Sequence, residues 1–416
     1  MFHSLYNAGI YGYTAVLRLA SLFHPKAKLW TDGRRGVFEK IADWRSQQKG
    51  KVYWFHAASL GEFEQGRPII EAIKKSDAEI KIVLTFFSPS GYEIRKNYSG
   101  ADLVVYLPAD TPSNAKRWIA ELKPDTAVFI KYEYWANYFF ELKKSRIPLV
   151  VISAIFREGQ RFFGFQQSFW KRVLSCVDHF FLQNQSSLRL LNGLGEFPCT
   201  VAGDTRYDRV IEIAEEKRRI EKVEQFIGRR KALIVGSSYE AEQRIIQSLM
   251  ASRFSKEWCY IVAPHEMDQS AIDQFIAHCG SGKAIRYSQY SASFNGSVMV
   301  IDNIGMLSAL YRYGNVALIG GGFGRGLHNA LEAAVYGIPV AYGPNHQKFD
   351  EARLLVAEKG AATADTTEEL TKKLAEMMED DDLCGEMGHR NEEIIRRESG
   401  AIRVIMSYFE KNSALK

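Results

Sequence analysis

The sequence predicts an α/β protein with two doubly wound domains, each built on a parallel sheet. Short apolar runs that are typical of buried strands alternate with helical patterns from Lys51 onward. The alternation breaks near residue 204 and begins again after a charge-dense stretch. The chain has 416 residues, which is more than one ordinary core accommodates, so two domains are expected.

The first segment, residues 1–35, is apolar and rich in tyrosine. Residues 1–17 contain no Asp, Glu, Lys or Arg, and Arg18 is the only such residue before Lys26. No basic region precedes the apolar run, which argues against a cleaved signal peptide, and Arg18 interrupts the run before the ~20 residues that a membrane-spanning helix needs. Tyrosine and the basic residues that follow suit a membrane interface. We expect a short membrane-anchoring helix; the alternative is a helix packed on the protein itself.

Residues 36–204 form the expected first domain, a Rossmann-like fold. Helical patterns, for instance 63–75 and 111–122, separate several of its strands. The strand-like runs are 52–56, 80–86, 103–106, 126–130, 148–152 and 179–182.

Residues 205–416 form the expected second domain, which is also Rossmann-like. The charge-dense stretch 212–231 is interpreted as one solvated helix, and the acidic run 379–382 as a helix end. The predicted strands are 232–235, 260–263, 298–302, 316–320 and 339–341.

A glycine cluster follows the strand at 316–320. Glycines without side chains let an anion approach the backbone, and a helix that opens near Asn329 adds free N–H groups and partial positive charge. Glu332, in the first turn of that helix, is placed to accept hydrogen bonds from ribose hydroxyls. The pattern favours a nucleotide phosphate site over a plain tight turn. Its members are Gly321, Gly322, Gly324, Arg325, Asn329 and Glu332.

A candidate general base follows the first strand, in the segment from His56 to Glu62. Ser59 and Gly61 form a turn there, and Glu62 stands at the start of the next helix. A sugar hydroxyl is a poor nucleophile until a base removes its proton, and a carboxylate in a partly dehydrated cleft can do this. The alternative is a first-turn residue favoured by the helix dipole. Glu64 is a weaker rival because it should point away from Glu62.

Further candidates lie at other strand ends. Glu133 follows the fourth strand and either supports Glu62 or holds the acceptor. Ser237 and Ser238 either bind a phosphate or cap a helix. His265 either contacts the nucleotide or is structural, and Arg206 either faces an anionic sugar or pairs with a neighbouring aspartate.

Composition excludes several classes of function. The net charge of +5 is mild, and neither stacked-aromatic RNA motifs nor zinc-finger spacing is present, so no nucleic-acid partner is expected. The five cysteines are scattered without a CxxC pair, which indicates neither disulfides nor a structural metal.

Two α/β domains with a phosphate loop in the second follow the plan of GT-B glycosyltransferases, whose facing sheets make a cleft beyond their strand ends. On this plan the acceptor binds to residues 36–204 and the nucleotide-sugar to residues 205–416. The order and spacing of five segments resemble the Kdo (3-deoxy-D-manno-octulosonic acid) transferase family over nearly the whole chain. The segments are HAASLGE at 56–62, EYWAN at 133–137, GDTRYD at 203–208, GSS at 236–238 and the block 320–344 with HNALE at 328–332.

The resemblance implies a concrete reaction. The donor would be CMP-Kdo and the acceptor a lipid A precursor (lipid IVA), in lipopolysaccharide synthesis at the cytoplasmic face of the inner membrane. The reaction would invert the anomeric carbon and need no bound metal. Glu62 matches the family's general base, Glu133 its second acidic residue, and Asn329 and Glu332 its residues at the nucleotide.

The sequence departs from the family at three positions. Pro264 replaces a common arginine, Lys131 an acidic residue and Arg206 a lysine, so individual donor contacts differ. Two other functions stay open: a GT-B transferase or epimerase acting on a UDP-sugar, and a non-catalytic module that binds a nucleotide-sugar or lipid.

Overall fold

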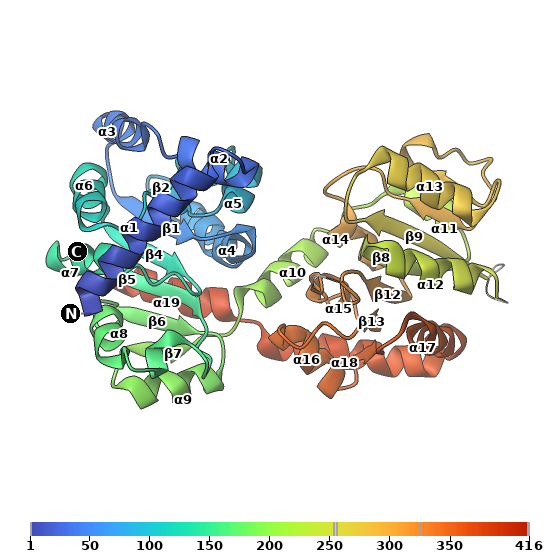
Figure 1. Cartoon of the computed structure of the whole chain (residues 1–416). Coiled ribbons are helices and arrows are strands. Elements are labelled where there is room, and N and C mark those ends of the chain that lie inside the picture. The colour runs from blue at the N-terminus through green and yellow to red at the C-terminus, as the bar shows by residue number, and fades with distance from the viewer. Residues whose placement is uncertain (1, 253, 255–256, 325, 414–416) are drawn as a thin grey trace. The chain divides into compact units, whose positions relative to one another are not determined.

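The structure, a computed structural model, describes residues 2–252, 254, 257–324 and 326–413. The chain divides into two compact units (Figure 1). The first comprises Met1–Asp208 together with Ser399–Lys416, and the second comprises Arg209–Glu398. The sequence-based division instead ended the first domain at residue 204 and kept the whole C-terminus in the second. A terminal helix that returns to the first unit leaves no mark in local sequence patterns, because its partner lies far away along the chain.

The first unit contains a seven-stranded sheet in the order β3-β2-β1-β4-β5-β6-β7, and all its strand pairs are parallel. Its strands are β1 (Val52–Ala57), β2 (Lys81–Phe86), β3 (Leu103–Tyr106), β4 (Thr126–Ile130), β5 (Leu149–Ala154), β6 (His179–Leu182) and β7 (Cys199–Val201).

Helices cover both faces of this sheet. They are α1 (Phe2–Ala20), α2 (Pro25–Asp32), α3 (Val37–Gln47), α4 (Leu60–Ser76), α5 (Pro89–Arg95), α6 (Pro112–Leu122), α7 (Ala136–Lys144), α8 (Gln167–Leu174), α9 (Gln185–Leu194), the start of α10 (Thr205–Glu215) and α19 (Ala401–Ser413), with a 3₁₀ turn at Arg161–Phe163. Successive side chains of a strand point to opposite faces. Trp54 therefore packs in one core, while Tyr53 and Phe55 pack in the other with Phe409 of α19.

The second unit repeats this architecture with the parallel order β10-β11-β9-β8-β12-β13-β14. Its strands are β8 (Lys231–Ser238), β9 (Trp258–Pro264), β10 (Ala284–Arg286), β11 (Val298–Val300), β12 (Val316–Ile319), β13 (Val340–Tyr342) and β14 (Ala361–Thr363). Its helices are α11 (Glu221–Ile227), α12 (Glu240–Met250), α13 (Gln269–Cys279), α14 (Leu307–Leu310), α15 (Leu331–Ala334), α16 (Asp350–Ala357), α17 (Thr367–Glu379) and α18 (Asp381–Glu398), with 3₁₀ turns at Tyr287–Gln289 and Tyr311–Tyr313.

The two parallel α/β sheets confirm the predicted class, with local corrections. The strands β7, β10 and β14 were not predicted; each has three residues and lies at a sheet edge, where pairing on one side leaves a weak apolar signal. The charge-dense stretch is not one helix, because α10 ends at Glu215, α11 begins at Glu221 and the chain then enters β8.

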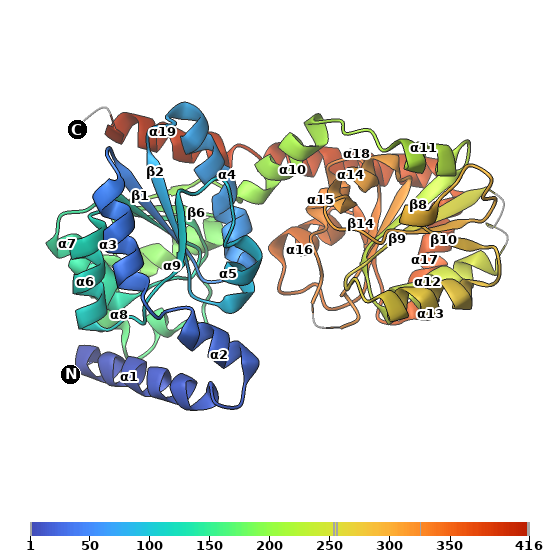
Figure 2. The ribbon, with the colours of Figure 1, turned by 90° about the horizontal axis from the view of Figure 1, so that it is seen from above.

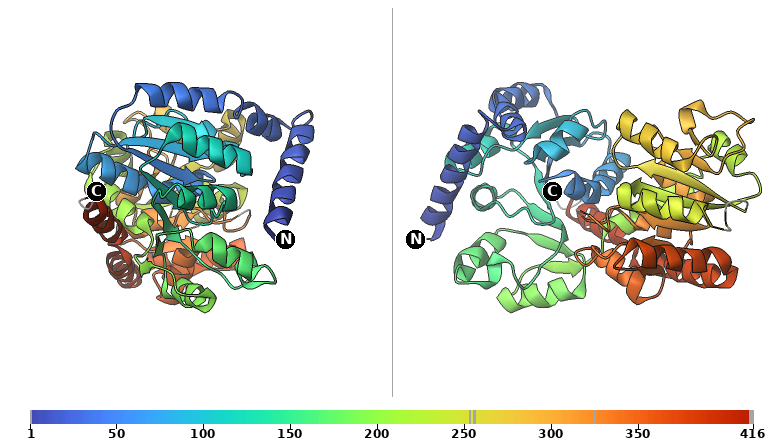
Figure 3. Two further views of the ribbon diagram at one scale, coloured as in Figure 1. Left: turned by 90° about the vertical axis from the view of Figure 1, so that its left-hand side faces the viewer. Right: turned by 45° about the vertical axis from the view of Figure 1, so that its right-hand side comes forward.

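Helix α1 lies on the side of the first unit opposite to α19 (Figures 2 and 3). Its polar side chains bond to the unit: the Tyr6 hydroxyl donates to Asp110 at 2.6 Å, and His3 and Asn7 lie 2.8 and 2.9 Å from the amide of Asn137. Apolar residues on its other side and in the following turn are exposed, Leu19 by 66% and Phe23 by 89%. None of the helices in the described part of the chain is both long and apolar enough to cross a membrane.

The buried carboxyl group of Asp110, which accepts a hydrogen bond from Tyr6 of α1, makes the free energy of unfolding depend on pH. Burial raises the pKa of Asp110 to about 6, against hydrogen bonds from Tyr6 and from the backbone of Asn137 and Tyr138. The unfolded chain releases this proton near pH 4, so the folded state retains it between about pH 4 and 6, and the free energy of unfolding should fall by up to about 1.4 kcal/mol per pH unit in that range.

Urea unfolding of the wild type and Asp110→Asn at several pH values tests this expectation. The asparagine does not titrate, so the difference in unfolding free energy between the two proteins isolates Asp110. The wild type should lose stability relative to the variant as the pH rises from about 4 to about 6. A difference that stays constant over this range would contradict the raised pKa.

Candidate active site

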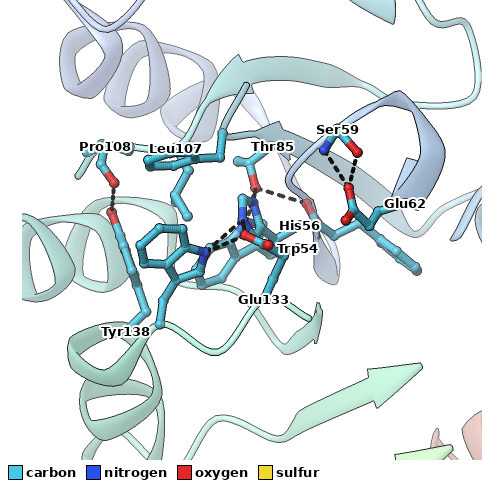
Figure 4. A network of polar contacts seen from close by, with 12 residues as sticks. Trp54, His56, Ser59, Glu62, Thr85, Leu107, Pro108, Glu133 and Tyr138 are labelled. Carbon is cyan, nitrogen blue, oxygen red and sulfur yellow. Dashed lines mark hydrogen bonds and ion pairs between the residues drawn. The ribbon is translucent and has the colours of Figure 1, made fainter. Parts of the chain in front are cut away.

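Glu62 lies at the carboxyl end of β1, in the first turn of α4. Ser59 is the N-cap of α4, and its backbone N–H donates to Glu62 Oε2 at 2.8 Å; its hydroxyl donates to the same oxygen (Figure 4). This is a capping box, in which two orphan groups of a helix end satisfy each other. Within the described residues Glu62 Oε1 accepts no hydrogen bond, so one oxygen stays available at the half-buried turn.

The other members of this turn have distinct roles. Gly61 is exposed, and a Cβ there would meet only Ser59 Oγ, at 3.9 Å. Glu64 points to two arginines, with 2.7 Å to Arg95 and 3.7 Å to Arg67. The ion pairs occupy Glu64, so it is a poor candidate for a base.

Glu133 follows β4 and contacts a different set of groups. Its Oε2 accepts a hydrogen bond from Trp135 Nε1 at 2.8 Å and lies 3.2 Å from His56 Nε2. In the described chain no hydrogen bond joins Glu133 to Glu62; Figure 4 shows the two carboxylates with separate partners. Glu133 therefore does not support Glu62 by direct contact.

Glu133 borders a pocket of about 720 Å³ at this end of the sheet. We call this the aromatic pocket; it is lined mainly by Tyr6, Tyr132, Trp135, Phe162 and Trp170, together with Glu133 and Arg157. Aromatic faces beside a carboxylate and a guanidinium suit a sugar, whose C–H faces pack on rings while its hydroxyls bond to charged groups.

Arg206 forms an ion pair with Asp204, which was one of the two interpretations of its sequence position. Its Nη2 donates to Asp204 at 2.7 Å, and Gln65 donates to the same oxygen at 3.1 Å. Burial opposes ionisation of Asp204, but the charges of Arg206 and Lys131 and the hydrogen bonds from Arg206 hold the pKa of Asp204 below its ordinary value. Arg206 is thus fixed by a buried carboxylate.

The glycine cluster of the second unit is packed more tightly than its sequence indicated. A Cβ at Gly320 would lie 2.0 Å from the Ser237 carbonyl oxygen, and one at Gly322 would lie 2.5 Å from Gly343 N. Gly321 has φ of +90°, and its N–H donates to Glu242 at 3.2 Å. Burial raises the pKa of Glu242.

These contacts limit where an anion can approach the backbone of the cluster. The N–H of Gly321 is directed to Glu242, and Gly320 and Gly322 allow close backbone packing. Gly324 is exposed, and a Cβ there would have its nearest neighbour at 3.9 Å. Of these four glycines, Gly324 leaves most room for a ligand; Arg325 lies outside the described residues.

Asn329 and Glu332 are brought together beyond the cluster. Asn329 Nδ2 donates to Glu332 Oε1 at 3.1 Å, and Ser308 donates to Glu332 Oε2 at 3.0 Å. The helix expected to open near Asn329 is α15, which begins at Leu331 and has four residues. The site therefore depends on side-chain bonds more than on a helix dipole.

An aromatic stack joins the ends of β8, β9 and the glycine segment. The rings of His265 and His328 have centroids 4.5 Å apart, the ring of Tyr239 stacks on His265 at 4.8 Å, and the Tyr239 hydroxyl lies 3.1 Å from His328 Nε2. Burial, with the charge of His265, lowers the pKa of His328 to about 4, so His328 is neutral near pH 7.

The two serines beside this stack are placed differently. Ser237 is half-buried and has φ of +52°, in the region that favours glycine. The hydroxyl of Ser238 is buried without a hydrogen-bond partner in the described chain. The backbone of Ser238 accepts a bond from His265 N at 3.0 Å, which fixes the end of β9 to that of β8.

Sequence reasoning did not assign Tyr239, Glu242, His328, His56 or Thr85. His56 and His328 belong to segments that carry the family resemblance, and that was the available signal. Tyr239 and Glu242 form a second capping box at the start of α12. In the sequence, its only sign is an acidic residue three positions after a turn. No group of three or more His, Cys, Asp or Glu side chains placed to hold a metal occurs among the described residues.

The two parallel α/β units carry a carboxylate at one strand end and a glycine segment with paired Asn329 and Glu332 at another. Comparison with known proteins shows what the chain is similar to. The family model described as "3-Deoxy-D-manno-octulosonic-acid transferase (kdotransferase)" matches residues 32–209. This match covers most of the first unit of the chain.

Relatives of the same name align with most of the chain, and solved structures share its fold. The chain is 27% identical to the 3-deoxy-D-manno-octulosonic acid transferase of Aquifex aeolicus, over 78% of this chain and 85% of that protein. It is 23% identical to the enzyme of the same name from Haemophilus influenzae, over 86% and 87%. By structure it resembles UDP-GlcNAc 2-epimerase from Neisseria meningitidis (TM-score 0.61, 15% identity, 87% of this chain and 100% of that chain) and MurG from Acinetobacter baumannii (0.57, 14%, 87% and 100%). These two likenesses show the fold.

Proposed function

We propose that this protein transfers Kdo from CMP-Kdo to a lipid A precursor, lipid IVA, in lipopolysaccharide synthesis. Kdo transferase relatives that cover most of the chain support this proposal. The observation that carries it is Glu62, whose one free oxygen stands at a strand's carboxyl end in the family's HxxSxGE segment.

The reaction we propose inverts the anomeric centre. Glu62 takes the proton of an acceptor hydroxyl, and the oxygen forms its bond to the anomeric carbon of Kdo. The bond from that carbon to the CMP phosphate breaks, and its electron pair leaves with CMP. The donor binds to the second unit, near Gly324, Asn329 and Glu332, and the proposed reaction requires no bound metal.

Mass analysis of the product from CMP-Kdo and lipid IVA, with and without a chelator, tests the proposal. We expect the acceptor to gain the mass of Kdo, with equal yield in both samples. If the acceptor gained mass only with UDP-sugars, the donor would be a UDP-sugar rather than CMP-Kdo. If neither donor gave a product, the protein would be a binding module. Loss of product with chelator would overturn metal independence alone.

We further propose that α1 holds the protein peripherally at the cytoplasmic face of the inner membrane. The exposed apolar side chains of α1 and the turn after it, next to basic residues, support this. The helix also bonds to the first unit through Tyr6 and Asn7, so it is a surface that stays packed on the protein rather than a free anchor.

The double substitution Leu19→Gln/Phe23→Gln should weaken sedimentation with anionic vesicles by about tenfold or more, because two apolar side chains no longer enter the interface. Activity on detergent-dispersed acceptor should change little. Ile304→Gln is the matched control, since Ile304 is 86% exposed in the other unit. Vesicle binding that is equal in all three proteins would refute the surface proposal.

A further inference from the structure

The contact between His56 and Glu133 is a second carboxylate system at the same sheet edge. His56 is fully buried on β1, and its ring packs on that of Phe129 at 5.1 Å. Its Nδ1 lies 2.9 Å from Thr85 Oγ1 and its Nε2 lies 3.2 Å from Glu133 Oε2. A buried histidine held at both nitrogens has one orientation.

Two arrangements of the hydrogens satisfy the donors and acceptors of this network. Thr85 Oγ1 accepts a bond from Trp54 Nε1 at 2.8 Å and has one proton of its own, for either His56 Nδ1 or the Phe55 carbonyl oxygen at 3.1 Å. If that proton goes to Nδ1, the neutral imidazole carries its hydrogen on Nε2. If it goes to Phe55, Nδ1 donates to Thr85, and Nε2 accepts a hydrogen bond from Trp135 Nε1 at 3.2 Å.

In the first arrangement, His56 Nε2–H donates to Glu133 Oε2. The Trp135 N–H, at 2.8 Å from the same oxygen, is the second donor. One oxygen of Glu133 thus receives two N–H groups, which fixes the plane of the carboxylate. Among the described residues Oε1 has no hydrogen-bond partner, and Glu133 retains 12% side-chain exposure and borders the aromatic pocket.

We propose that His56 is a positioning residue: with Trp135, it holds Glu133 so that Oε1 accepts a hydrogen bond from a hydroxyl of the acceptor sugar in the aromatic pocket. This inference rests on the proposed transferase function and adds a role that Glu62 does not fill. The ligand at Oε1 must be a hydrogen-bond donor, because an ionised carboxylate only accepts. The rings of Tyr132 and Trp135 border the same pocket.

Two substitutions of His56 separate positioning from packing. An asparagine places its amide near the former Nδ1 and retains a partner for Thr85, whereas a glutamine carries an N–H to the former Nε2, toward Glu133. His56→Asn should raise KM for lipid IVA by about 10- to 100-fold, the worth of a charge-assisted bond, and His56→Gln by less than about fivefold. KM for CMP-Kdo should change by less than about twofold in both variants, since the donor does not touch this network.

Equal losses in both variants, or equal effects on donor and acceptor, would show a merely structural role and overturn the inference. A second measurement needs no turnover and no variant of His56. The imidazole ¹⁵N spectrum of the wild type should show a protonated Nε2 whose signal moves in Glu133→Gln. A bare Nε2 overturns the inference, and absence of Kdo transfer in the wild type overturns the proposed function instead.

Discussion

Glu62→Gln should reduce kcat for Kdo transfer by about 10²- to 10⁴-fold, the range that a positioned general base contributes. The amide cannot take the proton of the attacking hydroxyl. Its oxygen can still accept the N–H of Ser59, because glutamine serves at this position of a capping box as glutamate does. The start of α4 should therefore remain intact, and the affinity for CMP-Kdo should change little.

Single-turnover kinetics and equilibrium binding of CMP-Kdo provide the measurement. Glu64→Gln is the matched control, since it lies in the same turn and loses its ion pairs with Arg95 and Arg67 without losing a base. The control should keep turnover within about threefold, as partly exposed ion pairs contribute little. If Glu62→Gln lost donor binding together with turnover, Glu62 would be a structural residue and the base would have to be sought elsewhere.

The prediction from sequence was most accurate where a buried parallel strand makes a long apolar run. The predicted run at Leu103–Tyr106 is β3, and the one at Thr126–Ile130 is β4. The strands β7, β10 and β14 lack such runs, because each has only three residues and is partly exposed. The return of α19 to the first unit was also not predicted, since its contact with α4 joins residues at opposite ends of the chain.

The candidate site was predicted as residue types at strand ends rather than as contacts. Glu62 and Glu133 do lie beyond β1 and β4, but which carboxylate meets His56 depends on how a buried side chain turns. The pairing of Arg206 with Asp204 was one of two open interpretations, and spacing alone did not decide between them. The carboxylate that accepts a hydrogen bond from the Gly321 N–H belongs to Glu242 of α12, far along the chain. No local sequence pattern predicts this contact.

The glycine segment shows why a residue type alone does not reveal a role. A glycine can be required for a left-handed backbone, for close packing or for access of a ligand. Gly320 needs no left-handed backbone, yet the carbonyl oxygen of Ser237 would lie 2.0 Å and its carbonyl carbon 2.7 Å from an added Cβ. Both atoms belong to β8, the neighbour of β12 in the sheet, so neither can move without disturbing the strand pair.

Gly320→Ala should therefore destabilise the second unit by about 3 kcal/mol or more, as overpacking of a rigid core does. For a unit of this size, that loss corresponds to a melting transition lowered by about 6–12 °C. Gly324→Ala is the matched control, because its nearest neighbour would be 3.9 Å away and its backbone is ordinary. Its stability should stay within about 0.5 kcal/mol of the wild type.

Calorimetry of the two variants, together with CMP-Kdo binding, distinguishes packing from ligand access. Gly320→Ala should lower the transition of the second unit, and any loss of donor affinity should accompany unfolding. Gly324→Ala should leave that transition unchanged and weaken donor binding, because a methyl group then stands where the phosphate approaches the backbone. If instead Gly320→Ala had the same melting temperature as the wild type, β8 and β12 could move apart more readily than their close approach implies. If Gly324→Ala bound CMP-Kdo with wild-type affinity, the phosphate would bind away from this glycine and closer to Asn329 and Glu332.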